Sequence, residues 1–125
     1  MTDSNQQSRL SKEEIDSVIT LYSNGQYQEA IDNIKALNKV YPNVPLLFNL
    51  VGACYRALGQ LEGSVKMFET AVNIKPDYSE AHNNLGNALK DLGRFDDAVK
   101  GYQQAIKIKP EIAEAHNNLG SALKD

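Results

Sequence analysis

Asparagine side chains are the groups in this 125-residue chain that are best suited to recognise a ligand. Residues 81–91 read AHNNLGNALKD and residues 115–125 read AHNNLGSALKD, so two nearly identical stretches carry paired asparagines. Each asparagine amide has one carbonyl oxygen and two N–H donors, which suits hydrogen bonding to the backbone of an extended peptide whatever its side chains. The two stretches therefore predict a peptide-binding surface made of repeated elements.

The repeat length is 34 residues, because His116 follows His82 by 116 − 82 = 34 positions. The same step back from His82 reaches Phe48 and then Glu14, so one register runs through the chain without an insertion. A repeat array of this kind forms one elongated domain with a continuous core. The register divides the chain into a polar tail and a repeat domain (residues 1–10 and 11–125), the latter with three full units and a half unit (11–44, 45–78, 79–112 and 113–125).

Turn and cap residues predict two helices in each full unit. Ser11 and Glu14 have the spacing of a capping box, which starts a helix, and Asp77 and Glu80 repeat that spacing. A glycine closes each first helix because it takes the left-handed conformation at little steric cost, and a proline stops each second helix. These residues are Gly25, Gly59 and Gly93, followed by Pro42, Pro76 and Pro110. We therefore expect an all-α fold.

The helix expected near residues 79–91 is amphipathic when successive residues are placed about 100° apart around its axis. Ala81, Leu85 and Leu89 share one side, which must pack on neighbouring helices. The opposite, polar sector should stay in water. It holds Glu80, Asn83, Asn84, Asn87, Lys90 and Asp91.

Small, aromatic and proline residues recur at fixed positions of these units. In the third unit they are Leu85, Gly86, Leu89, Gly93, Phe95, Ala98, Tyr102, Ala105 and Pro110. This pattern resembles the tetratricopeptide repeat family over residues 11–125. The resemblance implies a right-handed solenoid of antiparallel helix pairs, with about seven helices, that acts as a protein-interaction scaffold. The first unit matches least, with Val18 at the glycine position and Ile34 at an aromatic position.

In that family the first helices of successive units line a concave groove, and the resemblance places a peptide there. The expected groove residues are Asn49, Arg56, Asn83, Asn84, Asn87, Lys90, Asn117, Asn118 and Ser121. Asn84 and Asn118 resemble the asparagine ladder in the repeat arm of protein O-linked N-acetylglucosamine transferases. The alternative is that asparagine simply keeps an exposed helix face soluble.

Some members of the family grip the C-terminal carboxylate of a chaperone with lysine, asparagine and arginine at fixed groove positions. This chain has Ile15, Ile19, Leu50, Glu80 and Asn84 at those positions. A chaperone tail is therefore not the expected ligand.

Two histidines and one cysteine are the remaining candidates for chemistry. His82 and His116 would lie on equivalent helices about 8–10 Å apart, too far for both to bind one zinc ion at about 2 Å. Cys54 has no partner for an internal disulfide and no general base spaced to activate it. We expect packing roles for all three, with no metal, no cofactor and no enzymatic activity.

The net charge of −3 and the pI near 5.4 argue against nucleic acid or anionic lipid as a partner, because these need clustered basic residues. The first ten residues lack the apolar stretch of a signal peptide, and no later segment approaches the ~20 apolar residues of a membrane span. With a single cysteine as well, a reducing, cytoplasmic location is expected.

The half unit, residues 113–125, nearly copies an internal helix but has no second helix after it. Leu119, Ala122 and Leu123 would then lack cover on one side, so we expect the chain to be part of a longer array, and its exposed edge to stack on another chain at high concentration. Two alternatives to a peptide-binding scaffold stay open at this point. The chain could be the substrate-recruiting arm of a larger glycosyltransferase or sulfotransferase, or it could be a self-assembling scaffold.

Overall fold

The computed structural model describes residues 9–124, so residues 1–8 of the expected tail and residue 125 lie outside it. Within this range the chain is entirely helical, with no strand. The helices are α2 (Lys12–Ser23), α3 (Tyr27–Val40), α4 (Pro45–Ala57), α5 (Leu61–Ile74), α6 (Ser79–Asp91), α7 (Phe95–Ile108) and α8 (Ala113–Lys124). The predicted all-α class and the predicted seven helices are confirmed for the described residues.

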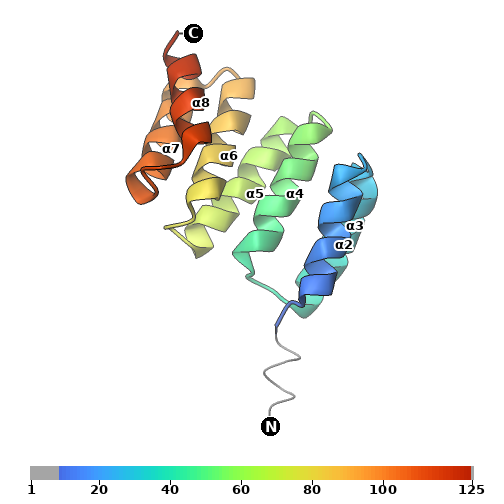
Figure 1. Cartoon of the computed structure of the whole chain (residues 1–125). Helices are drawn as coiled ribbons and strands as arrows, with labels where there is room; N and C mark the ends of the chain where they lie inside the picture. The colour runs from blue at the N-terminus through green and yellow to red at the C-terminus, as the bar shows by residue number, and fades with distance from the viewer. Residues whose placement is uncertain (1–8, 125) are drawn as a thin grey trace.

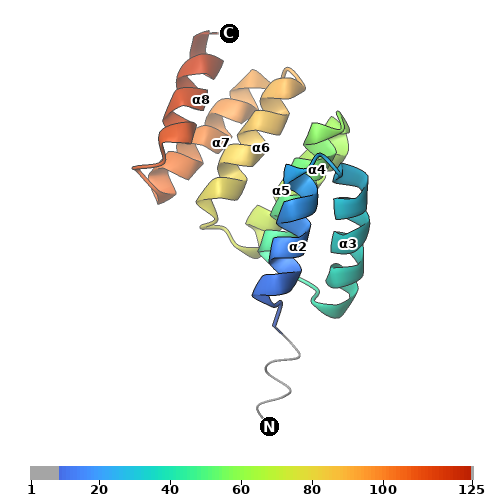
Figure 2. The same cartoon turned by 45° about the vertical axis from the view of Figure 1, so that its right-hand side comes forward.

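The helices form antiparallel pairs that stack into a right-handed solenoid (Figures 1 and 2). The first helices, α2, α4, α6 and α8, form one surface of the stack, and the second helices, α3, α5 and α7, lie behind them. We call the surface formed by α2, α4, α6 and α8 the inner face. None of the helices in residues 9–124 is long and apolar enough to cross a membrane.

Glycine turns join the two helices of each full unit, as the sequence predicts. Gly25, Gly59 and Gly93 have φ angles of +77°, +77° and +81°, in the left-handed region. The residue after each glycine donates its amide back into the preceding helix, for example Arg94 to the carbonyl of Leu89 at 2.9 Å. Glycine is required here because an L side chain is strained at these angles.

Of the two predicted capping boxes, one is confirmed and one is wrong. Ser11 Oγ accepts from the Glu14 amide at 3.1 Å, and Glu14 Oε1 accepts from the Ser11 amide at 2.9 Å. Asp77 does not cap α6, because the helix begins at Ser79 with Tyr78 as its N-cap and without a side-chain cap bond. Glu80 is then one residue short of the position that a capping box requires, and it faces Lys109 at 4.0 Å instead.

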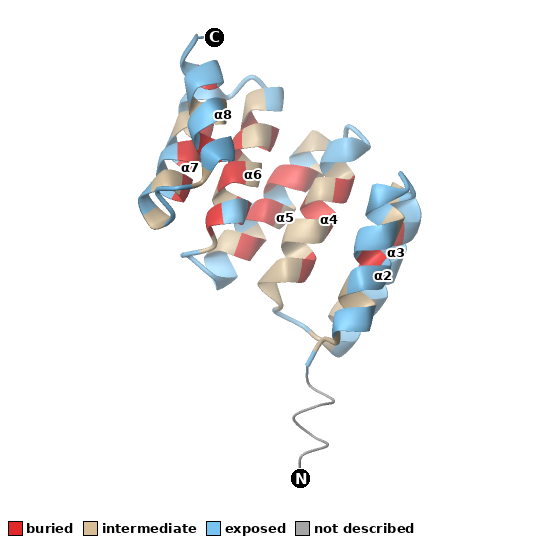
Figure 3. Cartoon of the chain, in the orientation of Figure 1, coloured by how far each residue is buried: buried red, intermediate tan, exposed pale blue. Residues whose placement is uncertain are grey.

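Glycines and aromatic rings hold the second and third units together. A Cβ on Gly52 would lie 2.7 Å from the ring of Phe68, and a Cβ on Gly86 would lie 2.6 Å from the ring of Tyr102. Both rings are at most 1% exposed, and Figure 3 shows the buried positions gathered between the paired helices. The missing side chain therefore lets each ring lie directly on the backbone of the first helix.

The first unit is built differently. Val18 occupies the glycine position and is fully buried, and Ile34 replaces the aromatic ring at 3% exposure. α2 and α3 consequently pack less closely than α4 with α5 or α6 with α7. Leu10, which the sequence assigned to the tail, is half-buried against this part of the core.

Candidate functional site

Asparagine side chains connect α4 to α6 on the inner face. Asn84 Nδ2 donates to Asn49 Oδ1 at 3.0 Å, and Asn49 Nδ2 donates to the hydroxyl of Tyr78 at 3.3 Å. Burial raises the pKa of Tyr78, which keeps its hydroxyl protonated at neutral pH. Asn49 and Asn84, both expected as groove residues, therefore bind one another across successive repeats.

A second asparagine pair connects α6 to α8. Asn118 Nδ2 donates to Asn83 Oδ1 at 3.1 Å, and Asn83 Nδ2 donates to Glu114 Oε2 at 3.3 Å. Asn83 is only 1% exposed, so the prediction that it offers its amide to the groove is wrong. The helical projection missed this because it considered α6 alone, and the neighbouring helix α8 covers the residue.

Charged residues make two further hydrogen bonds between successive first helices. We call these contacts and the two asparagine pairs together the ladder. Arg56 Nε donates to Asp91 Oδ2 at 2.6 Å between α4 and α6, and Lys90 Nζ donates to Ser121 Oγ at 2.7 Å between α6 and α8. Arg56 and Asp91 have 41% and 35% of their side-chain surface exposed. An ion pair this exposed contributes ~1 kcal/mol or less to stability, so it orients the two side chains more than it holds the fold.

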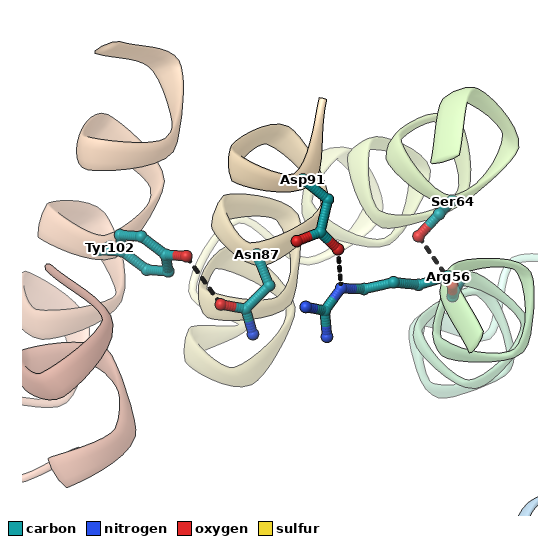
Figure 4. Close-up of polar contacts among 6 residues, drawn as sticks. Arg56, Ser64, Asn87, Asp91 and Tyr102 are labelled. Atoms are coloured by element: carbon teal, nitrogen blue, oxygen red, sulfur yellow. Dashed lines mark hydrogen bonds and ion pairs between the residues drawn. The ribbon is translucent and has the colours of Figure 1, made fainter. Parts of the chain in front are cut away.

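Asn87 is positioned by the buried ring of Tyr102. The Tyr102 hydroxyl donates to Asn87 Oδ1 at 2.7 Å (Figure 4). Burial raises the pKa of Tyr102 to about 12, with the nearby Arg56 lowering it and Asp91 raising it to smaller extents. The hydroxyl therefore stays a donor at neutral pH and turns the amide nitrogen of Asn87 outward.

The ladder leaves a defined set of groups for a ligand. Among residues 9–124, the Oδ1 atoms of Asn84 and Asn118 and the Nδ2 atom of Asn87 have no hydrogen-bond partner. Asn84 and Asn87 are three residues apart on α6, so an acceptor and a donor lie about one turn apart. Asn117 is exposed and is not part of the ladder.

A hollow of about 250 Å³ opens beside the ladder on the inner face. It is lined by Tyr22, Ala53, Arg56, Ala57, Phe68, Asn84 and Asp91, from α2, α4, α5 and α6. Ala53 is the second unit's counterpart of Asn87, since 87 − 34 = 53, and its small side chain leaves room above Phe68. The sequence predicted Arg56 and Asn84 as groove residues, but it did not predict that Phe68 of the second helix α5 also lines the hollow, although the change from Asn87 to Ala53 was a readable signal.

The inner face is apolar at its α2 end. Ile19 and Tyr22 are 42% and 37% exposed there, and the Tyr22 ring meets the edge of Tyr27 at a centroid distance of 5.4 Å. The hollow therefore lies at the boundary between an apolar surface on α2 and the polar ladder on α6 and α8.

Both histidines bind backbone carbonyls between repeats. His82 Nε2 lies 2.8 Å from the carbonyl oxygen of Pro76, and His116 Nε2 lies 2.8 Å from that of Pro110. Each ring thus ties the start of a first helix to the loop before it. Within residues 9–124, no group of three or more His, Cys, Asp or Glu side chains is arranged to hold a metal ion.

Cys54 belongs to the core of the first two units. It is fully buried, and burial raises the pKa of its thiol to about 11. A thiol that stays protonated at neutral pH is a poor nucleophile, so the predicted role as a small apolar residue is confirmed.

Comparisons with known proteins agree with this architecture. One relative is the anaphase-promoting complex subunit 3 of Dictyostelium discoideum, 32% identical over 59 residues, which make up 47% of this chain and 6% of that protein. The chain thus spans a small fraction of this relative's length.

Solved structures share the fold over most of the chain. The first TPR domain of Spaghetti (RPAP3), bound to an HSP90 peptide, has a TM-score of 0.83 at 24% identity and covers 87% of this chain and 86% of its own. The Sgt2 TPR domain of Aspergillus fumigatus has a TM-score of 0.86 at 23% identity, over 91% of this chain and 79% of its own.

The sequence model of the TPR repeat matches residues 52–93 and 86–125, more than half of the chain. The matched segments contain both glycine and aromatic pairs and exclude the divergent first unit, as the resemblance anticipated. The chain belongs to the TPR repeat family.

Proposed function

We propose that this protein is a non-catalytic interaction module that binds an extended peptide segment along its inner face. The observation that carries the proposal is the hollow between α2, α4 and α6, with unpaired amide groups beside it. A hollow that combines apolar surface with a few fixed polar groups is a common form of binding site in a folded protein. Ala53 and Phe68 supply its apolar surface, while Arg56 and Asn84 supply the polar groups.

Backbone recognition would come from α6 and α8. Asn84 and Asn118 each offer a carbonyl oxygen to a peptide N–H, and Asn87 offers an N–H to a peptide carbonyl. These amides are already held by neighbouring side chains, so little rotamer entropy is lost when the peptide binds. The hollow then selects one aliphatic side chain of the peptide, and the remaining N–H groups of Arg56 favour a carbonyl or carboxylate next to it.

The proposal distinguishes this chain from two of its structural relatives. The RPAP3 domains in the similar structures hold HSP90 and HSP70 peptides. Here the family's carboxylate-clamp positions include Ile15, Ile19 and Leu50, which cannot bind a terminal carboxylate. We therefore infer an internal peptide segment as the ligand, with its backbone read by the asparagines.

A random dodecapeptide library displayed on phage tests the proposal. Peptides selected on the wild-type protein are then measured by calorimetry against the double variant Asn84→Ala/Asn118→Ala. We expect affinity to fall by at least about tenfold, the equivalent of one lost hydrogen bond of about 1.4 kcal/mol. Gln103→Ala, at an exposed position of α7, is the matched control and should bind normally. Equal binding by the double variant would place the peptide elsewhere.

A second candidate function is self-association through α8. Leu123 is 66% exposed, and a Cβ on Gly120 would meet nothing within 4 Å, unlike Gly52 and Gly86. We propose that a second copy of the chain covers this surface at high concentration. Light scattering across a dilution series should show dimers that Leu123→Glu abolishes, whereas a constant monomer mass at millimolar concentration would exclude this function.

A further inference from the structure

A second pocket lies on the other side of α4 from the inner face. Its volume is about 70 Å³, and residues of α3, α4 and α5 line it. The lining residues are Ile34, Lys35, Asn38, Leu47, Phe48, Val51, Tyr55 and Met67. The α4 residues of this outer pocket alternate with Asn49, Ala53 and Arg56 of the inner face, so the two sites share a helix but no residue.

Asn38 gives the outer pocket an unsatisfied hydrogen-bond acceptor. Its Oδ1 atom is buried and has no hydrogen-bond partner among residues 9–124. Such groups are rare in folded proteins, because burial removes the water that would otherwise bind them. Asn38 is also one of the residues that line the cavity, so a rotation of its side chain would bring this unsatisfied oxygen to a donor on a ligand there.

The other repeats have no polar residue at this position. The counterparts of Asn38 are Val72 and Ile106, since 38 + 34 = 72 and 72 + 34 = 106. The counterpart of Val51 is the larger Leu85. The counterpart of Met67 is Gly101, where an added Cβ would lie 3.1 Å from the carbonyl oxygen of His82, so α7 packs closely on the backbone of α6. Between the first and second units, a cavity and a hydrogen-bond acceptor thus take the place of apolar packing.

The size and surface of the outer pocket define what fits in it. Its volume of about 70 Å³ is roughly half that of the engineered cavity of about 150 Å³ that takes up benzene. It has room for the branched end of a leucine or valine side chain but not for an aromatic ring. Its lining is almost wholly apolar, and a stable buried water needs about two to four polar partners, so water is a poor occupant.

Lys35 lines this pocket, and Lys39 lies one helical turn from it on α3. Lys35 and Lys39 are four residues apart on α3, and both are exposed. Neither forms an ion pair within residues 9–124. A ligand that enters beside them gains from carrying acidic groups.

We propose that the outer pocket is a second peptide-binding site, which takes one aliphatic side chain of an acidic peptide. The Asn38 side chain turns toward the pocket so that its Oδ1 accepts from a peptide N–H, and carboxylates on either side of the aliphatic residue face Lys35 and Lys39. This site is independent of the inner face and of the peptide proposed there.

The probe is the pentapeptide acetyl-Asp-Glu-Leu-Asp-Glu-amide, titrated into the full chain while the methyl signals of Ile34, Leu47, Val51 and Met67 are followed by NMR. These signals should shift saturably. The same peptide with alanine in place of leucine should bind at least about tenfold more weakly, because it loses the buried apolar carbons.

Two variants copy the third unit into the outer pocket. Asn38→Val introduces the residue found at Val72, and Val51→Leu introduces the residue found at Leu85. Each variant should raise the melting temperature and lower the affinity for the leucine peptide at least about tenfold, because Asn38→Val removes the hydrogen-bond acceptor and Val51→Leu fills the cavity.

The double variant Asn84→Ala/Asn118→Ala serves as the control and should bind the pentapeptide normally, because it alters only the inner face. Three results would overturn the proposal: no saturable shift at the four methyl-bearing residues, equal binding of the leucine and alanine peptides, or undiminished binding by Asn38→Val. Loss of pentapeptide binding in the control variant would move the site to the inner face.

Discussion

The first and third units have the same topology but different means of holding their two helices together. In the third unit the ring of Tyr102 lies directly on the backbone at Gly86, at a position where a Cβ would be 2.6 Å away. In the first unit Val18 and Ile34 fill the same space with two branched side chains, and the helices are in looser contact. A 34-residue register therefore sets where the helices lie, while one glycine and aromatic pair decides how closely they pack.

The largest expected effect is at the aromatic residue of the third unit. Tyr102→Ala should lower the free energy of unfolding by about 3–5 kcal/mol, because a fully buried ring leaves a cavity that its rigid surroundings cannot fill. Urea unfolding monitored by circular dichroism measures this loss. Tyr102→Phe, which copies Phe68 of the second unit, should cost ~1 kcal/mol. If the phenylalanine variant is as unstable as the alanine variant, the hydroxyl rather than the ring holds the unit.

A smaller effect is expected at the glycine beneath that ring. Gly86→Ala should destabilise by about 1–3 kcal/mol because the added carbon would overlap Tyr102. Gly120→Ala is the matched control: nothing lies within 4 Å of its added carbon, and alanine is the better helix former by about 1 kcal/mol. Thermal unfolding should show a lower melting temperature for Gly86→Ala and a higher one for Gly120→Ala. A stabilising Gly86→Ala would contradict the close packing.

The second unit differs from the third at Cys54, whose counterpart is Ala88. The unfolded thiol ionises near its ordinary pKa of 9.0, whereas burial raises the folded pKa to about 11. Unfolding thus releases a proton between these values, so the thiol's contribution is complete below pH 9 and is lost as the pH rises through 11. The loss is on the order of 2 kcal/mol for a fully buried group.

Cys54→Ala removes that pH dependence. Urea unfolding at a series of pH values from neutral to alkaline should show a shallower decline for the variant than for the wild-type protein. Parallel curves would mean that ionisation of Cys54 does not contribute to alkaline unfolding.

The smallest effect is expected on the inner face. Arg56→Ala should change the free energy of unfolding by less than about 1 kcal/mol, because the ion pair with Asp91 is exposed to solvent. Asn84→Ala should cost about 1 kcal/mol for its single hydrogen bond to Asn49. Either variant proving more damaging than Tyr102→Ala would reverse the assignment of folding and binding residues.

The sequence predicted the fold well because its signals are local and periodic. Gly25, Gly59 and Gly93 define the turns wherever they occur, and each helix has an apolar side that can be recognised from its own residues. The prediction that Asp77 caps α6 is wrong because its spacing to Glu80 fits a helix that begins one residue earlier than Ser79. Helix starts depend on small backbone differences that spacing alone does not contain.

The candidate site was less predictable because it arises between repeats. The sequence indicated which asparagines lie on first helices, but not that Asn83 is covered by α8 or that Asn84 binds Asn49. The outer pocket was missed for a similar reason. Asn38 is one polar residue in an amphipathic helix, and only the packing of α4 and α5 against it makes its oxygen buried.

Native-state hydrogen exchange tests the contrast between the units most directly, since it reports the opening free energy of each helix in the unaltered protein. The amides of α6 and α7 should open with free energies at least about 1 kcal/mol above those of α2. Amides of α2 that are as protected as those of α6 and α7 would contradict the claim that the glycine and aromatic pair makes the third unit the tighter one.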